Sequence, residues 1–225
     1  MIPYKDNNPI RIVPFVTIGI ISVNFLIFIW QIFSTGGLQG SIFAYGAIPH
    51  NMLTLKTQQP VNPFFTVFSS MFMHAGLLHL SFNMLYLWIF GNNIEDKLGH
   101  VRFGFFYLFC GSISAYAHAV TEPGSNIPMV GASGAVSGVL GAYIFLFPKA
   151  MVHTIIILGF FITTVKIPAL IVIGFWAIIQ LVNGLISTGI DHEGGVAWFA
   201  HIGGFIVGVL LISAFGKKNH KVWIN

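Results

Sequence analysis

The chain has 225 residues, of which 56% are hydrophobic and only 7% are charged, and its mean hydropathy is +0.84. Roughly a quarter of the residues in a water-soluble domain are charged, so this composition excludes an ordinary soluble protein and favours one that lies in a lipid bilayer. The net charge of +4 comes without a basic face or an aromatic-basic stripe, which argues against nucleic-acid binding.

Long apolar segments predict six membrane-spanning helices, because a helix needs about 20 mostly apolar residues to cross a bilayer. The six segments lie at about 12–33, 77–94, 101–121, 131–148, 168–187 and 197–216. Residues 152–165 are also apolar, but the short distance between Lys149 and Lys166 predicts an interfacial or re-entrant segment there. The expected fold class is therefore all-α, a polytopic six-helix bundle that forms a single domain over residues 1–225.

The distribution of basic residues predicts the orientation of this bundle, since Lys and Arg collect on cytoplasmic flanks. With six helices and cytoplasmic termini, nine of the ten Lys and Arg residues fall inside and only Lys56 falls outside. A seventh helix at 152–165 would divide them five to five. The first ten residues lack the apolar core of a signal peptide. We therefore expect both termini on the cytoplasmic side.

Several polar side chains occur inside the apolar segments, where ionisable groups are costly and usually functional. They are, in chain order, His74, His79, Asn83, Ser133 and His201. The predicted topology places all of them at a similar depth near the outer surface, so they can converge on one site.

Glycines accompany these residues on the fourth and sixth predicted helices. They are Gly131, Gly134, Gly138 and Gly141 on the fourth, and Gly203, Gly204 and Gly208 on the sixth. Small residues let membrane helices approach closely. We therefore expect the two helices to pack together and to bring Ser133 within reach of His201, with His74, Gly131, Gly134 and Gly204 as structural support.

The pairing of a serine with a histidine indicates nucleophilic catalysis. A serine hydroxyl becomes an effective nucleophile when a neighbouring base takes its proton, and neutral His201 is the candidate base for Ser133. Donors for an oxyanion are available from the Ser133 amide, His79 and Asn83. All six acidic residues, including Asp191 and Glu193, lie in loops or at helix ends, so we expect a Ser-His dyad without a triad acid.

The chain resembles the rhomboid intramembrane serine proteases over essentially residues 12–216. The motifs that carry the resemblance are HAGLLHLSFNM at 74–84, GNNIEDKLG at 91–99, GASGAVSGVLGAY at 131–143, Ile167-Pro168-Ala169 followed by Trp176 and Gln180, and AHIGG at 200–204. They occur in the order and with the spacing typical of the family.

The resemblance implies Ser133 as nucleophile, His201 as base, and His79 and Asn83 near the oxyanion. It implies single-span membrane proteins as substrates, no cofactor, no metal, and substrate access beside helix 168–187. It also implies a bacterial plasma membrane, with the site open to the extracytoplasmic side. Two features depart from the family. Residues 34–73 contain no Trp-Arg pair, and Ser137 stands where many relatives have an aromatic residue that packs on the histidine.

Three other functions remain open from the sequence. A catalytically inactive rhomboid-like protein could bind membrane clients with the same fold. A transporter or channel could use the intramembrane polar residues as a permeation path. A metal site could be built from His74, His79 and His201, although no HExxH motif accompanies them.

Overall fold

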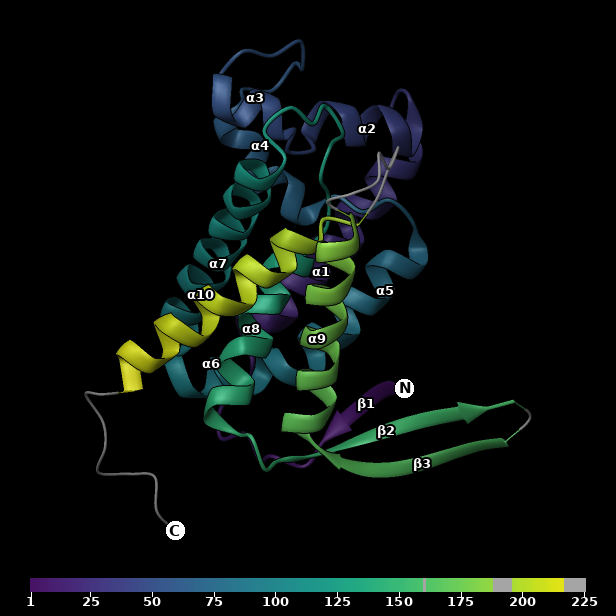
Figure 1. The fold of residues 1–225 in the computed structure, drawn as a ribbon, viewed down its shortest axis with the longest axis vertical. Coiled ribbons are helices and arrows are strands. Elements are labelled where there is room, and N and C mark those ends of the chain that lie inside the picture. Colours follow the sequence, from purple (N-terminus) through teal and green to yellow (C-terminus); the bar gives the residue numbers. More distant parts are fainter. Residues whose placement is uncertain (160, 188–195, 217–225) are drawn as a thin grey trace.

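A bundle of helices with a three-stranded antiparallel sheet at one end makes up the computed structural model, which describes residues 1–159, 161–187 and 196–216 (Figure 1). The helices that form the centre and one side are α7 (His100–Thr121), α8 (Ser133–Leu146), α9 (Ala169–Ser187) and α10 (Trp198–Gly216). Helix α8 is the most enclosed, because ten of its residues are buried. Helix α10 packs against α7, α8 and α9.

The remaining long helices form the other side of the bundle. They are α1 (Phe15–Phe33) and a continuous helical run made of α5 (Leu77–Tyr86), the π-helical η2 (Leu87–Gly91) and α6 (Asn92–Leu98). Each of the six ranges predicted from hydropathy is therefore helical over most of its length.

Length and apolar character qualify four helices in the described residues as membrane spans. They are α1, α7, α9 and α10, and a fifth span results if Pro63–Phe72 and Leu77–Leu98 are counted together despite the 82° bend between them. Helix α8 has 14 residues, fewer than the about 20 that cross a bilayer. The bundle is thus a polytopic membrane fold, and the crossing of all six helices stays a prediction.

The fold is mostly helical as predicted, but it is not all-α, because residues before the first helix and between α8 and α9 form a three-stranded sheet. Its strands are β1 (Ile2–Asp6), β2 (Met151–Leu158) and β3 (Phe161–Pro168), in the order β1-β2-β3. The run expected to be interfacial or re-entrant is a β-hairpin that extends sideways from the end of the bundle (Figure 1). Residues 151–168 are rich in β-branched Ile, Val and Thr, which favour strands, and Gly159 adopts φ +59° at the turn.

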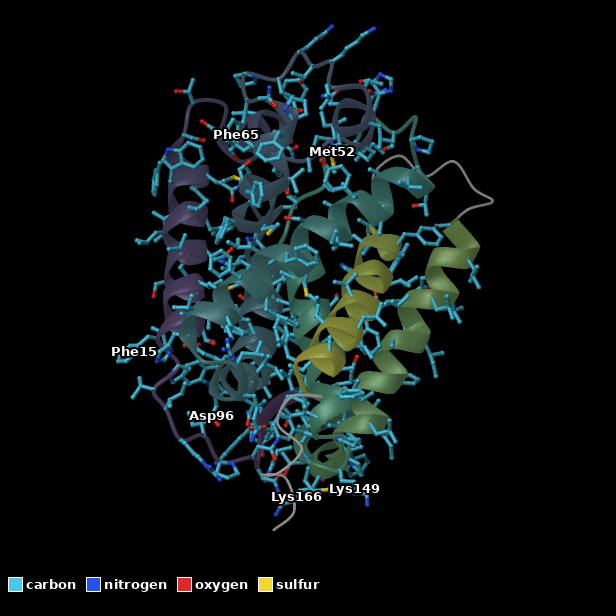
Figure 2. The ribbon with its side chains drawn as sticks, turned by 90° about the vertical axis from the view of Figure 1, so that its left-hand side faces the viewer. Phe15, Met52, Phe65, Asp96, Lys149 and Lys166 are labelled. Carbon is cyan, nitrogen blue, oxygen red and sulfur yellow. The ribbon has the colours of Figure 1, made fainter. Side chains whose placement is uncertain are left out.

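The connection between α1 and α5 forms the opposite end of the molecule. It consists of α2 (Gly37–Tyr45), α3 (Pro49–Thr54), α4 (Pro63–Ser69) and the 3₁₀ turn η1 (Ser70–Phe72). Figure 2 shows Met52 and Phe65 at this end and Lys149 and Lys166 at the other. The two lysines therefore lie at the end that the charge distribution assigns to the cytoplasm.

The motif at 91–99 holds the start of α1. The carboxylate of Glu95, fully buried on α6, accepts hydrogen bonds from the amides of Val16 and Thr17 at 2.9 and 2.7 Å. Asp96 accepts from the amides of Arg11 and Ile12 at 2.7 and 3.0 Å. The first amides of a helix lack partners within it, so Glu95 accepts from two of them, while Asp96 holds the segment that leads into α1.

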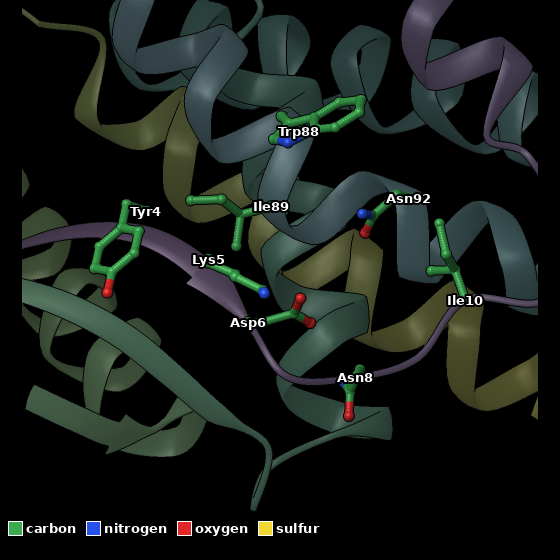
Figure 3. A pocket seen from close by; sticks show the side chains of 8 residues that line it. All are labelled: Tyr4, Lys5, Asp6, Asn8, Ile10, Trp88, Ile89 and Asn92. Atoms are coloured by element: carbon green, nitrogen blue, oxygen red, sulfur yellow. The ribbon is translucent and has the colours of Figure 1, made fainter.

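A cavity of about 340 Å³ lies beside β1, between the strand and the run from η2 to α6 (Figure 3). Asp6 lines it, and Tyr143 of α8 and Asn93 of α6 donate hydrogen bonds to the Asp6 carboxylate at 2.6 and 3.0 Å. Burial raises the pKa of the Asp6 carboxyl, although these donors lower it in part. The cluster ties the first strand to the helices at the end opposite the α2–α4 connection.

Candidate active site

Ser133 is the first residue of α8. The preceding Gly131 has φ +121°, a conformation that favours glycine, and its amide donates to the Ser70 carbonyl at 2.9 Å. Because the first amides of a helix point outward without carbonyl partners, the Ser133 amide is available at the end of α8. The sequence thus places a hydroxyl and a free backbone donor on the same residue.

His201 lies in the first turn of α10, and its Nε2 is 2.8 Å from Ser133 Oγ. Both side chains are half-buried, and 68 residues separate them in the chain. The close packing of α8 on α10 creates this contact. The structure therefore brings together the serine and the histidine that the sequence singled out.

Glycines make that packing possible. A Cβ at Gly204 would overlap the carbonyl oxygen of Gly134, and one at Gly208 would overlap that of Gly138. Neither overlap can be relieved by a side-chain rotation, since both involve backbone atoms. Beside them, Ser114 Oγ of α7 donates to the Ala200 carbonyl at 2.7 Å and fixes the chain next to His201.

Two tryptophans and a glutamine surround the His201 ring. Its centroid is 6.1 Å from the Trp176 ring of α9 and 6.3 Å from the Trp198 ring of α10. Its Nδ1 is 2.7 Å from Oε1 of Gln180, also on α9. Ser137, which stands in place of an aromatic residue, instead donates to the Ser133 carbonyl at 2.6 Å.

His79 and Asn83 of α5 lie next to the loop that leads into α8. A Cβ at Gly131 would be 2.7 Å from His79 Nε2 and 3.7 Å from Asn83 Nδ2, so only glycine lets the loop approach this closely. Asn83 Nδ2 donates to the His79 carbonyl one helical turn earlier at 3.0 Å. His79 and Asn83 therefore lie close to the loop residue Gly131, two positions before Ser133.

His74 lies behind His79, with ring centroids 5.1 Å apart, and is fully buried. Among the described residues neither ring nitrogen of His74 has a hydrogen-bond partner. Its backbone is held by Gln31 of α1, whose Oε1 accepts from the His74 amide at 2.9 Å. Gln31 had no role in the sequence analysis, although a fully buried glutamine in an apolar helix is itself a signal.

A cavity of about 40 Å³ adjoins Ser133 on its α7 side, large enough for one or two water molecules. Small residues line it, among them Gly111, Ala115, Ala135 and Ala200. Chemically, a serine hydroxyl that is hydrogen-bonded to an imidazole, beside a helix amide without a partner, can carry out acyl transfer.

The alternative of a metal site needs a cluster of ligands, and the part of the chain that the structure describes contains none. No group of three or more His, Cys, Asp or Glu side chains there could hold a metal ion. Asp191 and Glu193, the acidic residues closest in sequence to His201, lie outside the described residues.

Comparison with known proteins supports the assignment suggested by the motifs. The model of the Rhomboid domain matches residues 61–218. The chain is 35% identical over 146 residues to the Bacillus subtilis protein named Rhomboid protease GluP, and 33% identical over 153 residues to RHOMBOID-like protein 4 of Arabidopsis thaliana. These matches cover 64% and 68% of the chain, but only 24% and 34% of the two relatives.

A mitochondrial relative matches over a longer stretch. The mouse protein named Presenilin-associated rhomboid-like protein is 28% identical over 215 residues, which is 92% of this chain and 49% of that protein. The chain thus spans half or less of the length of these curated relatives. Because the domain match covers most of the sequence and the helices are apolar enough to span a bilayer, the chain is an integral membrane protein that belongs to the rhomboid family.

Proposed function

We propose that the protein is a serine endopeptidase that hydrolyses a peptide bond in or next to the transmembrane segment of membrane-protein substrates. The observation that carries this proposal is the 2.8 Å contact between Ser133 Oγ and His201 Nε2. The family membership and the relative named as a protease support the same reaction.

The acylation step uses only these two side chains for bond making and proton transfer. Ser133 Oγ attacks the substrate carbonyl carbon, its proton passes to His201 Nε2, and the carbonyl π electrons move to the oxygen. The tetrahedral intermediate then collapses, the C–N bond breaks, and the leaving amine takes the proton from His201. The product is an ester of Ser133 with the new carboxyl end of the substrate.

Deacylation repeats these steps with water as the nucleophile. The water gives a proton to His201 Nε2 and attacks the ester carbonyl carbon, and Ser133 Oγ recovers the proton when the C–O bond breaks. Through both steps the negative charge on the substrate oxygen needs donors. The Ser133 amide, together with the side chains of His79 and Asn83, is proposed to supply them.

Substrates are proposed to be single-span membrane proteins. Peptide bonds in a regular helix are shielded by its own hydrogen bonds, so the segment that is cut should contain small or helix-weakening residues that allow local unwinding. Access is proposed beside α9, whose outward face carries exposed apolar side chains such as Phe175, Ile178 and Leu185. The proposed reaction needs no metal and no cofactor.

The proposal also covers the membrane in which the protein lies and its orientation there. We propose a bacterial plasma membrane, cytoplasmic termini and a site that opens on the extracytoplasmic side. The gathering of Lys149 and Lys166 at the end opposite Met52 supports this orientation (Figure 2). The pairing of β1 with β2, far along the chain, supports a single domain over residues 1–225.

The test is cleavage of a single-span reporter in liposomes by wild type, Ser133→Ala and His201→Ala. Each variant should retain its thermal transition and lose cleavage by about 10³-fold or more. Cleavage that survives Ser133→Ala would contradict the proposed mechanism. A wild-type protein that cuts none of several reporters, and whose Ser133 does not react with a fluorophosphonate, would favour the client-binding alternative.

A further inference from the structure

We propose that Gln180 is a positioning residue for catalysis, which holds His201 in the one tautomer that can act as a base. The inference rests on the proposed function, because it concerns how the same dyad is activated. The observation that carries it is the contact of 2.7 Å between Gln180 Oε1 and His201 Nδ1.

The geometry decides which nitrogen of His201 carries the hydrogen. An amide oxygen can only accept a hydrogen bond, so Nδ1 facing Gln180 Oε1 must be the protonated nitrogen. Nε2 then presents its lone pair to Ser133 Oγ, 2.8 Å away, as a general base requires. In the other tautomer the hydrogen on Nε2 would point at the serine oxygen, and no proton could be taken.

The position of Gln180 on α9 fits this role. Most of the helix is apolar, yet Gln180 is only 6% exposed and lies one turn from Trp176 and one turn from the buried Gly184. These three residues follow one face of α9 that is turned toward α10. A polar side chain is costly there, and the hydrogen bond to His201 offsets that cost.

The use of a neutral amide suits the surroundings. In soluble triads a buried carboxylate holds the histidine tautomer and stabilises the imidazolium. A carboxylate within the apolar part of a membrane helix would be far more expensive than an amide. Gln180 provides the acceptor without the charge, and Trp176 packs beside the same ring at 6.1 Å between centroids.

The direct test measures how fast a fluorophosphonate labels Ser133, because this small reagent reports activation of the serine without needing a membrane substrate. Gln180→Leu should lower the labelling rate and kcat by about 10- to 100-fold, the range expected for losing a hydrogen bond to a group that becomes charged. The Michaelis constant should change little. Asn183→Leu, which also replaces a side-chain amide by leucine at a half-buried position on the same helix, should match wild type.

The pH profile separates positioning from simple structural support. In Gln180→Glu the carboxylate still accepts from Nδ1 and favours the protonated ring, so labelling should persist while the acidic limb of the profile moves to higher pH. If Gln180→Leu does not fold, judged by its thermal transition, this shift in Gln180→Glu decides alone.

The outcomes distinguish this inference from the proposed function. A folded Gln180→Leu variant that labels at the wild-type rate, or an acidic limb unmoved in Gln180→Glu, overturns the role of Gln180 and leaves the dyad intact. A wild-type protein that neither labels nor cleaves, or cleavage that survives Ser133→Ala, overturns the proposed function itself.

Discussion

His201 is the residue at which three helices meet. It belongs to α10, its Nε2 contacts Ser133 of α8, and its Nδ1 contacts Gln180 of α9. Each contact is made by a different ring nitrogen, so the ring is fixed in position and in tautomer at once. A small displacement of any one helix would therefore change the chemistry of the serine.

The buried carboxyl of Asp6 should make the stability of the fold depend on pH. Because burial raises the pKa of its carboxyl in the folded state, the folded protein binds this proton more readily than the unfolded chain does. Stability from this group is therefore highest at low pH and falls as pH rises from about 4 toward the raised folded value. Asp6→Asn removes that titration while its amide oxygen can still accept from Tyr143.

The measurement is the apparent melting temperature in detergent between about pH 4 and about pH 7. The melting temperature of Asp6→Asn relative to wild type should rise with pH. A constant difference across the range would show that Asp6 does not titrate differently on folding.

Residue by residue, the sequence predicted the meeting of Ser133 and His201 better than it predicted the residues that support them. Ser133 and His201 could be found because each is polar, stands inside an apolar segment and has glycines nearby. Gln180 was visible only as part of a family motif, because a glutamine has no reactivity of its own and its role depends on which atom it faces. The amide of Gln31 was missed for the same reason.

At the scale of elements, the contact between α8 and α10 determines the site. Gly208→Ala should destabilise the protein by about 1–3 kcal/mol or more, because the added methyl group meets the carbonyl of Gly138 and neither backbone can yield. The matched control is Gly174→Ala on α9, where nothing lies within 4 Å of the added atom.

Thermal unfolding in detergent checks this pair. The control should match or slightly exceed wild type, since alanine favours helix. Equal losses in both variants would mean that glycine flexibility matters rather than close packing. If Ser133 and His201 act as proposed, cleavage by Gly208→Ala should fall with its stability, because the same helix contact sets the distance between the two side chains.

The helices could be predicted from length and hydropathy, whereas the sheet could not. Residues 152–165 are apolar enough for a helix, and their polarity does not alternate as in a half-buried strand. The informative signal was the content of β-branched residues around Gly159. Strand β1 is only five residues long, and nothing local indicates a partner as distant as β2.

For the whole molecule, α9 has two proposed roles that make opposite demands, since one requires the helix to stay in place and the other requires it to let substrates pass. It supplies Gln180 to the site, and it borders the side where we propose that substrates enter. Its inner residue Gly184 lies against Trp198 of α10, where an added Cβ would be 3.3 Å from that of the tryptophan. This spacing is close to the separation of about 3.8 Å in a disulfide.

A Gly184→Cys, Trp198→Cys double variant can therefore lock α9 to α10. Oxidation should abolish cleavage of the single-span reporter, reductant should restore it, and labelling of Ser133 by the small fluorophosphonate should continue in both states. The single-cysteine variants, which cannot form this bond, should not respond to oxidation. Equal reporter cleavage in the oxidised and reduced forms would argue against access beside α9.

The central position of α10 also has a consequence for biosynthesis. Helices α7, α8 and α9 all precede it in the chain, and yet each packs against it. Until the ribosome has made α10, Ser133 lacks its proposed base, and Gly141 of α8 lacks the backbone of Phe205 that packs against it. Under the proposed mechanism, a nascent chain therefore stays unreactive toward the membrane proteins around it, and the proposed hydrolytic activity arises only when the last of these helices docks.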